Sequence, residues 1–211
     1  MKSKKWTLIL TSLTALTLMT ACGQSTTKSS TTAAADTTAI TTSAKNSQSS
    51  YFTEKDYDTS YDENTASKIE LSGSSASVSG DGVTVSGSTV NITKSGTYVI
   101  SGQSDGVQIK VEADKEADVH LVLKGASMSN TDAAISATSA GHVYLTLAEG
   151  ATNSLSDSSS NSDEKANAAL FSKVDLTING SGTLTVDGKK NNGIKANDTL
   201  HITGGTYNIT A

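Results

Sequence analysis

Short segments with apolar residues at every second position recur along the sequence from Lys68 onward, each ending at Gly, Asn, Asp or Ser. A period of two residues is typical of β-strands, and no segment there has the 3.6-residue period of a helix. The segments also align with one another: DVHLVL, HVYLTL, DLTING and TLHITG match position by position. The sequence therefore predicts an all-β fold built from a repeat.

Three families of aligned segments predict three walls around one core. The first family superposes Val119, Val143, Leu176 and Leu200, and then Leu121, Leu145, Ile178 and Ile202. The second superposes Tyr98, Leu184 and Tyr207, and then Ile100, Val186 and Ile209. The third places Ile135, Leu170 and Ile194 together after a small residue, as at a tight corner.

The repeat unit spans 24 residues from Leu170 to Ile194 and 35 from Ile135 to Leu170, the longer copy carrying a loop at residues 156–165. Such a unit cannot bury its apolar faces alone, so neighbouring units must stack, with strands about 4.8 Å apart. We predict a β-solenoid. The competing fold is an antiparallel sandwich, because short strands with glycine turns fit it as well.

The N-terminus reads as an export signal. Lys2, Lys4 and Lys5 precede a short apolar run, and Thr20-Ala21-Cys22 resembles the site at which a lipid is attached before cleavage. We predict a lipoprotein signal peptide at residues 1–21 and lipidation at Cys22, with an ordinary secretory signal as the alternative. The protein would then be lipid-anchored at the outer face of the cell membrane, with no other membrane contact.

The predicted anchor is followed by a spacer. Residues 24–50 contain 20 Ser, Thr or Ala among 27, and such a stretch cannot bury enough apolar surface to become ordered. We predict a flexible tether at 22–50, a segment at 51–66 that caps the N-terminal end of the solenoid, and the solenoid itself at 67–211. The chain stops directly after a strand, so we expect a shortened relative of a longer protein.

The charged residues argue against a nucleic-acid partner. All 16 cations are lysine, and the net charge is -5. Base and phosphate recognition relies on the planar guanidinium group of arginine, which this chain lacks. Cys22 is the only cysteine, so disulfides and cysteine-based metal sites are excluded.

Two groups of oxygen-bearing side chains are candidate calcium ligands, since calcium binds six to eight oxygens. One group is the inserted loop, with Asp157, Asn161, Asp163, Glu164 and, close behind, Asn167. The other is a corner column of Asp132, Asn167 and Asn191. The alternatives are a solvated polar loop and a hydrogen-bonded amide ladder, respectively.

The first strand family also predicts an outward column. His120, Tyr144, Thr177 and His201 alternate with the buried positions, and Val122, Thr146, Asn179 and Thr203 form a column beside them. Rings and hydroxyl or amide groups in one row could bind a sugar chain. We name His120, Tyr144, Thr177, His201 and Asn179 as candidate carbohydrate-binding residues; an ordinary exposed sheet face is the alternative.

Several motifs in order resemble the carbohydrate-binding domain family of Gram-positive surface lipoproteins. They include VSGDGVTVSGSTVNITKSGTYVISG, LVLKGASMSNTDAAI and NAALFSKVDLTINGSGTLTVDG, and the similarity covers roughly residues 51–211. The resemblance implies a right-handed parallel β-helix akin to pectate lyases, bound calcium, and affinity for cellulose or polygalacturonate. The family's acidic corner motif would place calcium ligands at Asp175 and Asp198, although each copy here has lost one acid.

We therefore predict a monomeric, non-catalytic protein that binds polysaccharide at the cell surface, with calcium as a possible cofactor. The first alternative is a structural or adhesive stalk that binds protein or cell wall. The second is a weak polyuronate lyase, whose base would have to be a lysine such as Lys173 or Lys195 because the chain has no arginine. A glycosidase pair would be Asp175 with Asp198.

Overall fold

The computed structural model describes residues 51–211, so the predictions for the signal peptide, Cys22 and the tether lie outside the described residues. The described part is all-β, as predicted, and its one helix is the single turn α2 (Glu54–Tyr57). No helix in this part is long and apolar enough to cross a bilayer. The strands are β1 (Ser67–Gly73), β2 (Ser75–Ser79), β3 (Val83–Ser86), β4 (Thr89–Ile92), β5 (Gly96–Asp105), β6 (Gln108–Glu112), β7 (Asp118–Ser129), β8 (Ile135–Ser139), β9 (His142–Leu147), β10 (Thr152–Ser156), β11 (Ala168–Ser172), β12 (Asp175–Gly180), β13 (Thr183–Asp187), β14 (Asn192–Ala196), β15 (Leu200–Ile202) and β16 (Thr206–Thr210).

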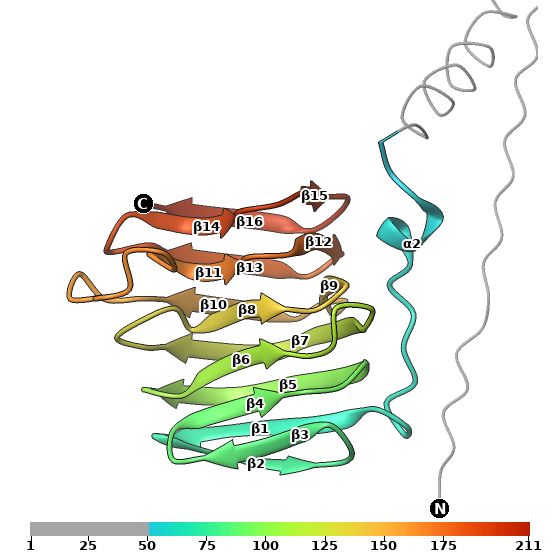
Figure 1. Ribbon diagram of the computed structural model, residues 1–211, viewed down its shortest axis with the longest axis horizontal. Helices are drawn as coiled ribbons and strands as arrows, with labels where there is room; N and C mark the ends of the chain where they lie inside the picture. Colours follow the sequence, from blue (N-terminus) through green and yellow to red (C-terminus); the bar gives the residue numbers. More distant parts are fainter. Residues whose placement is uncertain (1–50) are drawn as a thin grey trace, which may run out of the picture. The chain divides into compact units, whose positions relative to one another are not determined.

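Most strands pair in parallel ladders, one coil above the next (Figure 1). A ten-stranded sheet holds two of these ladders because the long strands β5 and β7 bend midway. The first ladder joins β1, β5, β7, β9, β12 and β15; the second joins the ends of β1, β5 and β7 with β10, β13 and β16. At the bend of β5 the register shifts between Ile100 and Gly102. Gly102 has φ +89, and a Cβ there would lie 2.3 Å from the Leu71 carbonyl oxygen, so only glycine fits.

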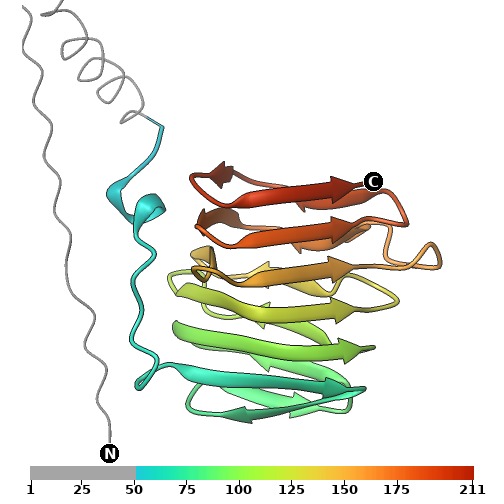
Figure 2. The ribbon, with the colours of Figure 1, turned by 180° about the vertical axis from the view of Figure 1, so that it is seen from behind.

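The third ladder is a six-stranded sheet in the order β14, β11, β8, β6, β4, β3. Within residues 51–211 only two strand pairs are antiparallel, β1 with β2 and β3 with β4, and both lie at the N-terminal end of the stack (Figure 1). These hairpins occupy the end that residues 51–66 were predicted to cap. Residues 51–61 run beside the stack instead, and residues 62–66 lead from there into β1 (Figures 1 and 2).

The strand registers confirm the first and third predicted walls. Val119 pairs with Val143, Val143 with Leu176, and Leu176 with Leu200 in the first wall; Ile135 and Ile194 both pair with Leu170 in the third. The second wall needs one correction. Tyr98 and Ile100 pair with Leu121 and Leu123 and so belong to the first wall, whereas Met128 and Leu155 occupy the second. The Gly-Thr-Tyr motif misled the alignment because the same turn opens strands in both walls.

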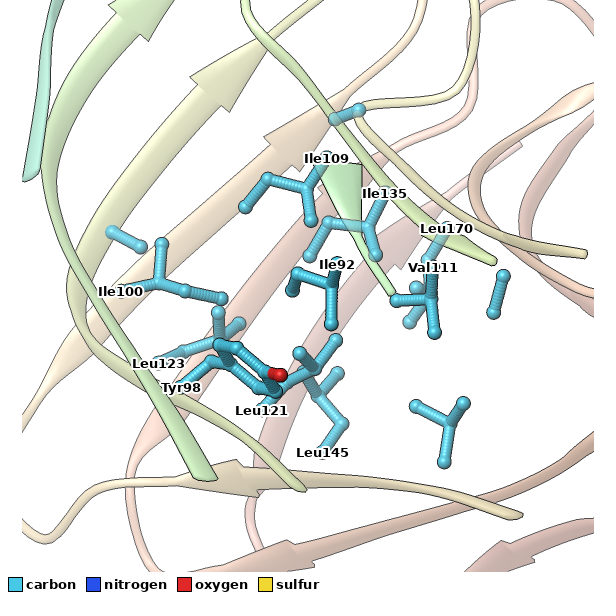
Figure 3. Packing of buried hydrophobic residues seen from close by; sticks show 14 of the residues in the cluster. Ile92, Tyr98, Ile100, Ile109, Val111, Leu121, Leu123, Ile135, Leu145 and Leu170 are labelled. Carbon is cyan, nitrogen blue, oxygen red and sulfur yellow. The ribbon is translucent and has the colours of Figure 1, made fainter. Parts of the chain in front are cut away.

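One apolar cluster fills the space between the ladders, and Figure 3 shows part of it. Ile100, Leu121, Leu145 and Ile178 have no exposed surface. Each such side chain contributes on the order of 1.5 to 3 kcal/mol by its removal from water. The cluster contains no residue before Ile69, so the stacked coils form their core without the preceding segment.

Two segments outside the coils cover the outer surfaces of the ladders. We call residues 51–61 the strap: it lies beside the stack, with α2 near the last coils and the following chain running to β1 (Figures 1 and 2). We call residues 157–167 the covering loop: it connects β10 to β11 and packs over the third ladder, where Ala166 joins Ala133, Ala168 and Phe171 in a small apolar cluster.

Candidate functional site

The predicted outward column exists in the first ladder. His120 pairs with Tyr144, Tyr144 with Thr177, and Thr177 with His201, so four successive strands place these side chains in one row. Asn179 pairs with Thr146 in the neighbouring row. The sequence alignment predicted both rows because a parallel ladder keeps repeat positions in register.

The column is nevertheless covered. Thr177 is 0% exposed, Asn179 1%, Thr146 2% and Tyr144 8%. The expectation of an open, solvent-facing row is wrong for these positions, because the strap lies across them. Its helix α2 contacts β12, the strand that carries Thr177 and Asn179.

Asp56, in α2, is the residue of the strap that is held most firmly. Its carboxylate accepts hydrogen bonds from Thr177 Oγ1 at 2.5 Å and, at 3.2 Å, from His201 Nδ1. Its backbone carbonyl accepts from Thr203 Oγ1 at 2.6 Å and Asn179 Nδ2 at 3.2 Å. Asp56 is 2% exposed, so the strap places one buried carboxylate on the predicted column.

The surroundings of Asp56 keep its carboxylate charged. Burial by itself raises the pKa, but the hydrogen bonds from Thr177, Thr53 and His201 together outweigh burial, so the pKa lies well below the ordinary value. Thr53 contributes both its backbone N–H and its hydroxyl, in a capping box at the start of α2. The local fold of the strap therefore prepares the carboxylate for the groups on the ladder.

Two hydrogen-bond chains connect the buried polar groups to the strap. Thr146 donates to Asn179 at 2.6 Å and therefore accepts from His120 Nε2 at 2.7 Å. In the same way Thr177 donates to Asp56 and accepts from His142 Nε2 at 2.9 Å. Nε2 of both histidines therefore carries a proton, and burial lowers the pKa of each, which favours the neutral ring.

A small cleft of about 230 Å³ remains open between the strap and the first ladder. The cleft is lined by the rings of His120 and Tyr144 and by the mainly polar residues around them. These residues are Lys55, Asp58, Ser60, Gly96, Thr97 and Asp118. Lys55 Nζ lies 4.8 Å from the Tyr144 ring centroid and forms an ion pair with Asp118. His142 stacks on the Tyr144 ring, with the centroids 4.1 Å apart.

The cleft offers hydrogen-bond donors and acceptors beside aromatic surface. Burial, with Asp118 and Asp56 nearby, raises the pKa of Tyr144 to about 12, so its hydroxyl remains a donor. Hydrogen bonds from Ser60 lower the pKa of Asp58, so its carboxylate remains an acceptor. This combination can orient a sugar unit through its hydroxyls.

The calcium candidates of the covering loop use their oxygens within the protein. Asp157 accepts from the backbone N–H of Lys189 at 2.7 Å, and Asn161 donates to its other oxygen at 3.2 Å. Asn161 accepts from Asp163 N at 2.9 Å, and Asp163 accepts from the backbone of Ala166 at 3.0 Å.

The remaining candidates lie apart from one another. Glu164 pairs with Lys190, Asn167 accepts from Asn192 and Lys195, Asp132 from Ser162 N, and Asp175 from Thr199 N. At the corner one amide pair is bonded: Asn192, the residue after Asn191, donates its Nδ2 to the backbone carbonyl and the Oδ1 of Asn167. Asp198 lies at the following corner, just before β15. Among residues 51–211, no three acidic or histidine side chains gather as a metal site would require. The geometry does not fit a calcium shell.

A second hollow, of about 460 Å³, lies beside the covering loop. Lys173 and Lys195, named above as possible lyase bases, line it together with Lys165 and Phe171. Lys195 Nζ donates to Asn167 Oδ1 and to the Lys165 carbonyl, each at 2.9 Å, which fixes its ammonium group. Neither of these lysines lines the cleft of His120 and Tyr144.

The sequence interpretation missed the strap as part of the site. Lys55, Asp56 and Asp58 contribute to the cleft or cover the column, although they precede the first strand. Thr53-Glu54-Lys55-Asp56 is a capping-box pattern that signals a helix start. It does not signal where the helix docks.

Comparisons with known proteins agree with this architecture. The model of the family described as carbohydrate-binding domain-containing protein matches residues 86–211. A protein of that description from Acetivibrio thermocellus is 41% identical over 126 residues, which are 57% of this chain and 44% of the relative. A solved structure of a polysaccharide lyase-like protein from C. thermocellum, a gadolinium derivative, has 38% identity and a TM-score of 0.67.

The solved structure matches 69% of this chain and 62% of its own chain. The chain therefore spans less than half of the relative's length and less than two thirds of that structure. The family match covers more than half of this chain and includes β7, β9 and β12, which carry the polar column. This chain belongs to the family of carbohydrate-binding domain-containing proteins.

Proposed function

We propose that the protein is a non-catalytic polysaccharide-binding module, displayed at the cell surface by a lipid on Cys22, and that its coils form a right-handed parallel β-helix. The observation that carries the binding role is the cleft in which His120 and Tyr144 meet Asp58, Asp118 and Lys55. The family match supports a polysaccharide ligand. The parallel ladders support the helix, and the signal sequence supports the location.

The cleft suits binding better than hydrolysis. A glycosidase needs a carboxylic acid whose pKa is raised enough to protonate the leaving group. Hydrogen bonds lower the pKa of Asp58 instead, and Asp118 is paired with Lys55. The cleft therefore supplies fixed acceptors, donors and a ring.

One alternative keeps support from a specific observation. The solved structure that resembles this chain is described as polysaccharide lyase-like, and the lysine-lined hollow next to Phe171 could hold an acidic sugar beside Lys173 or Lys195. Lyase action would require one of these lysines to act as a base. Unsaturated uronate products after incubation with pectate would support this alternative, and their absence would remove it.

The test is retention of the chain from Gly23 on insoluble cellulose and on pectate gel. We expect retention on at least one matrix, weakened about tenfold, or 1.4 kcal/mol, when His120 and Tyr144 are replaced by alanine. Gln103→Ala is the matched control, since Gln103 is exposed on β5 outside the cleft. Retention that is unchanged in the double variant would exclude the cleft.

Calcium dependence and the stalk are tested in the same assay. Calcium is proposed from the family resemblance alone, and no step of binding at the cleft goes through it. Loss of retention in chelator would show that calcium matters nonetheless. No retention on either matrix would favour the structural or adhesive stalk.

A further inference from the structure

We propose that the strap is a displaceable occupant of a second binding surface, and that polysaccharide must lift residues 52–58 to reach Thr177, Asn179, His201 and Thr203. This inference rests on the proposed function: the ladder side of the cleft, with Asp118, His120 and Tyr144, stays in place for the ligand, while Lys55 and Asp58 move away with the strap. The strap would hold the surface closed until a ligand competes with it.

The first support is that the coils do not need the strap for their core. The main apolar cluster begins at Ile69 and contains no residue of the strap. The strap adds no strand to any sheet, and its helix is a single turn. Lifting it would therefore leave the ladders and the core intact.

The second support is the chemistry of the covered surface. Thr146, Thr177 and Asn179 are among the few buried polar side chains of the described residues, and all three point away from the core in the first ladder. Hydroxyl and amide groups exchange their partners for water or for a ligand at little net cost. An apolar surface would not permit this exchange.

The third support is that the strap acts as a template for a ligand. On the ladder, Thr177 and His201 donate hydrogen bonds to the carboxylate of Asp56. Thr203 donates to the backbone carbonyl of Asp56, and Asn179 donates to that of Asp58. The Phe52 ring lies 4.7 Å from the His201 ring, centroid to centroid. An extended acidic sugar chain presents the same groups, namely carboxylates, further oxygens and a flat ring face.

The two ends of the strap are held differently. At the C-terminal end of the strap, Tyr61 packs together with Ala66 on the small apolar cluster of Val99, Val122 and Ala148. At the N-terminal end, which contains α2, Tyr51 and Tyr57 are 78% and 51% exposed, and the contacts are mainly polar ones around Asp56. We therefore expect the strap to open from the α2 end and to remain attached near Tyr61.

The energetic consequence is a reduced apparent affinity. When only a fraction of the molecules is open, the apparent dissociation constant rises by the inverse of that fraction. If about one molecule in ten is open, a variant whose strap is released binds about tenfold more tightly.

The first experiment uses Asp56→Ala in the chain from Gly23, with polygalacturonate and a soluble cellulose oligosaccharide as probes. We expect about tenfold tighter binding of the acidic probe, because the closed state loses its anchor. Thr185→Ala on β13 is the control, since Thr185 lies on the second ladder away from the strap. A folded Asp56→Ala variant that binds both probes like the unchanged chain would overturn the proposal.

The second experiment closes the strap covalently. Asp56→Cys with Thr177→Cys replaces two side chains that are in direct contact, in a soluble chain that has no other cysteine. We expect the oxidised form to bind the acidic probe at least about tenfold more weakly than the reduced form of the same protein. Equal binding by both forms, with the disulfide verified by mass, would contradict the inference.

The third measurement needs neither variants nor polysaccharide binding. The amides of Asp56 and Asp58 donate to Thr53 and Lys55 within the strap. Their hydrogen exchange should be faster than that of Leu121 in the core, because they open locally. Exchange at the global unfolding rate would show a fixed strap. If these amides exchange fast but the protein is retained on neither polysaccharide, the strap opens as proposed and the proposed function is wrong.

Discussion

The strap and the covering loop both cover the outer surface of a ladder, but by different means. The strap precedes the first strand and reaches strands more than 120 residues away in the sequence, chiefly through polar groups around Asp56. The covering loop is an insertion between adjacent strands of the repeat; it buries Phe171 and ties Asp157 to the next corner. The difference indicates that the loop is part of the folded core structure, whereas the strap is an attachment to it.

The largest expected effect compares the only two phenylalanines in the chain, one beneath the loop and one in the strap. Phe171 is 3% exposed and packs among alanines, so Phe171→Ala should cost about 3–5 kcal/mol of unfolding free energy. Phe52→Ala should cost less than about 1 kcal/mol, because the strap lies outside the core. Urea unfolding measures both. Equal losses would show that the strap is as integral to the fold as the loop.

The next comparison concerns Asp56 and Asp157, the two carboxylates that are buried among residues 51–211. Asp157→Ala removes the acceptor of the Lys189 backbone amide and one of the two acceptors of the Asn161 side-chain amide, and should cost about 1–3 kcal/mol in global stability. Asp56→Ala should reduce global stability by no more than the strap's own closing free energy, about 1.4 kcal/mol for one open molecule in ten. Chemical denaturation with two probes, one in the strap and one in the core, separates these effects. If both probes report one coincident transition and Asp56→Ala loses more unfolding free energy than Asp157→Ala, the strap is not a separate attachment.

Acid should release the strap before it unfolds the coils. The pKa of Asp56 is lowered in the folded state, so its contribution is fully present above the ordinary aspartate value of about 4 and is lost as pH falls toward the folded value. We expect the protection of the α2 amides, measured against their intrinsic exchange rates, to fall below about pH 4 in the unchanged chain. The same measurement on Asp56→Asn should show no such step, since asparagine does not titrate.

The smallest expected effect comes from His120 and His142. Burial lowers the pKa of both, so the folded protein favours the neutral rings that donate through Nε2. Stability is therefore present above the unfolded histidine value of about 6.5 and falls slightly as pH drops below it. NMR titration of the two rings checks this. A midpoint above 6.5 for either ring would contradict the lowering of its pKa by burial.

The repeat made the ladders predictable. Val143, Leu145 and their partners were placed correctly because a parallel stack repeats the same environment at each coil. Tyr98 was misplaced because its Gly-Thr-Tyr motif fits more than one wall. The row of His120, Tyr144, Thr177 and His201 was also predicted, since alternation assigns every second residue to the outer face.

The sequence by itself determined the all-β fold, two of the three walls and the polar column, because these depend on periodicity, which is local and repeated. Only the tertiary structure decided that the column is covered and that Asp56 holds the cover in place. It also decided that Asp157 accepts from the backbone of Lys189 at the next corner and that Asn161 donates to Ala166 within the loop. These contacts join segments that share no periodicity, and many other carboxylates could have made them. Which donor each carboxylate meets depends on where the folded coils place the hydrogen-bond donors in space. That placement cannot be read from the residues next to the carboxylate in the sequence.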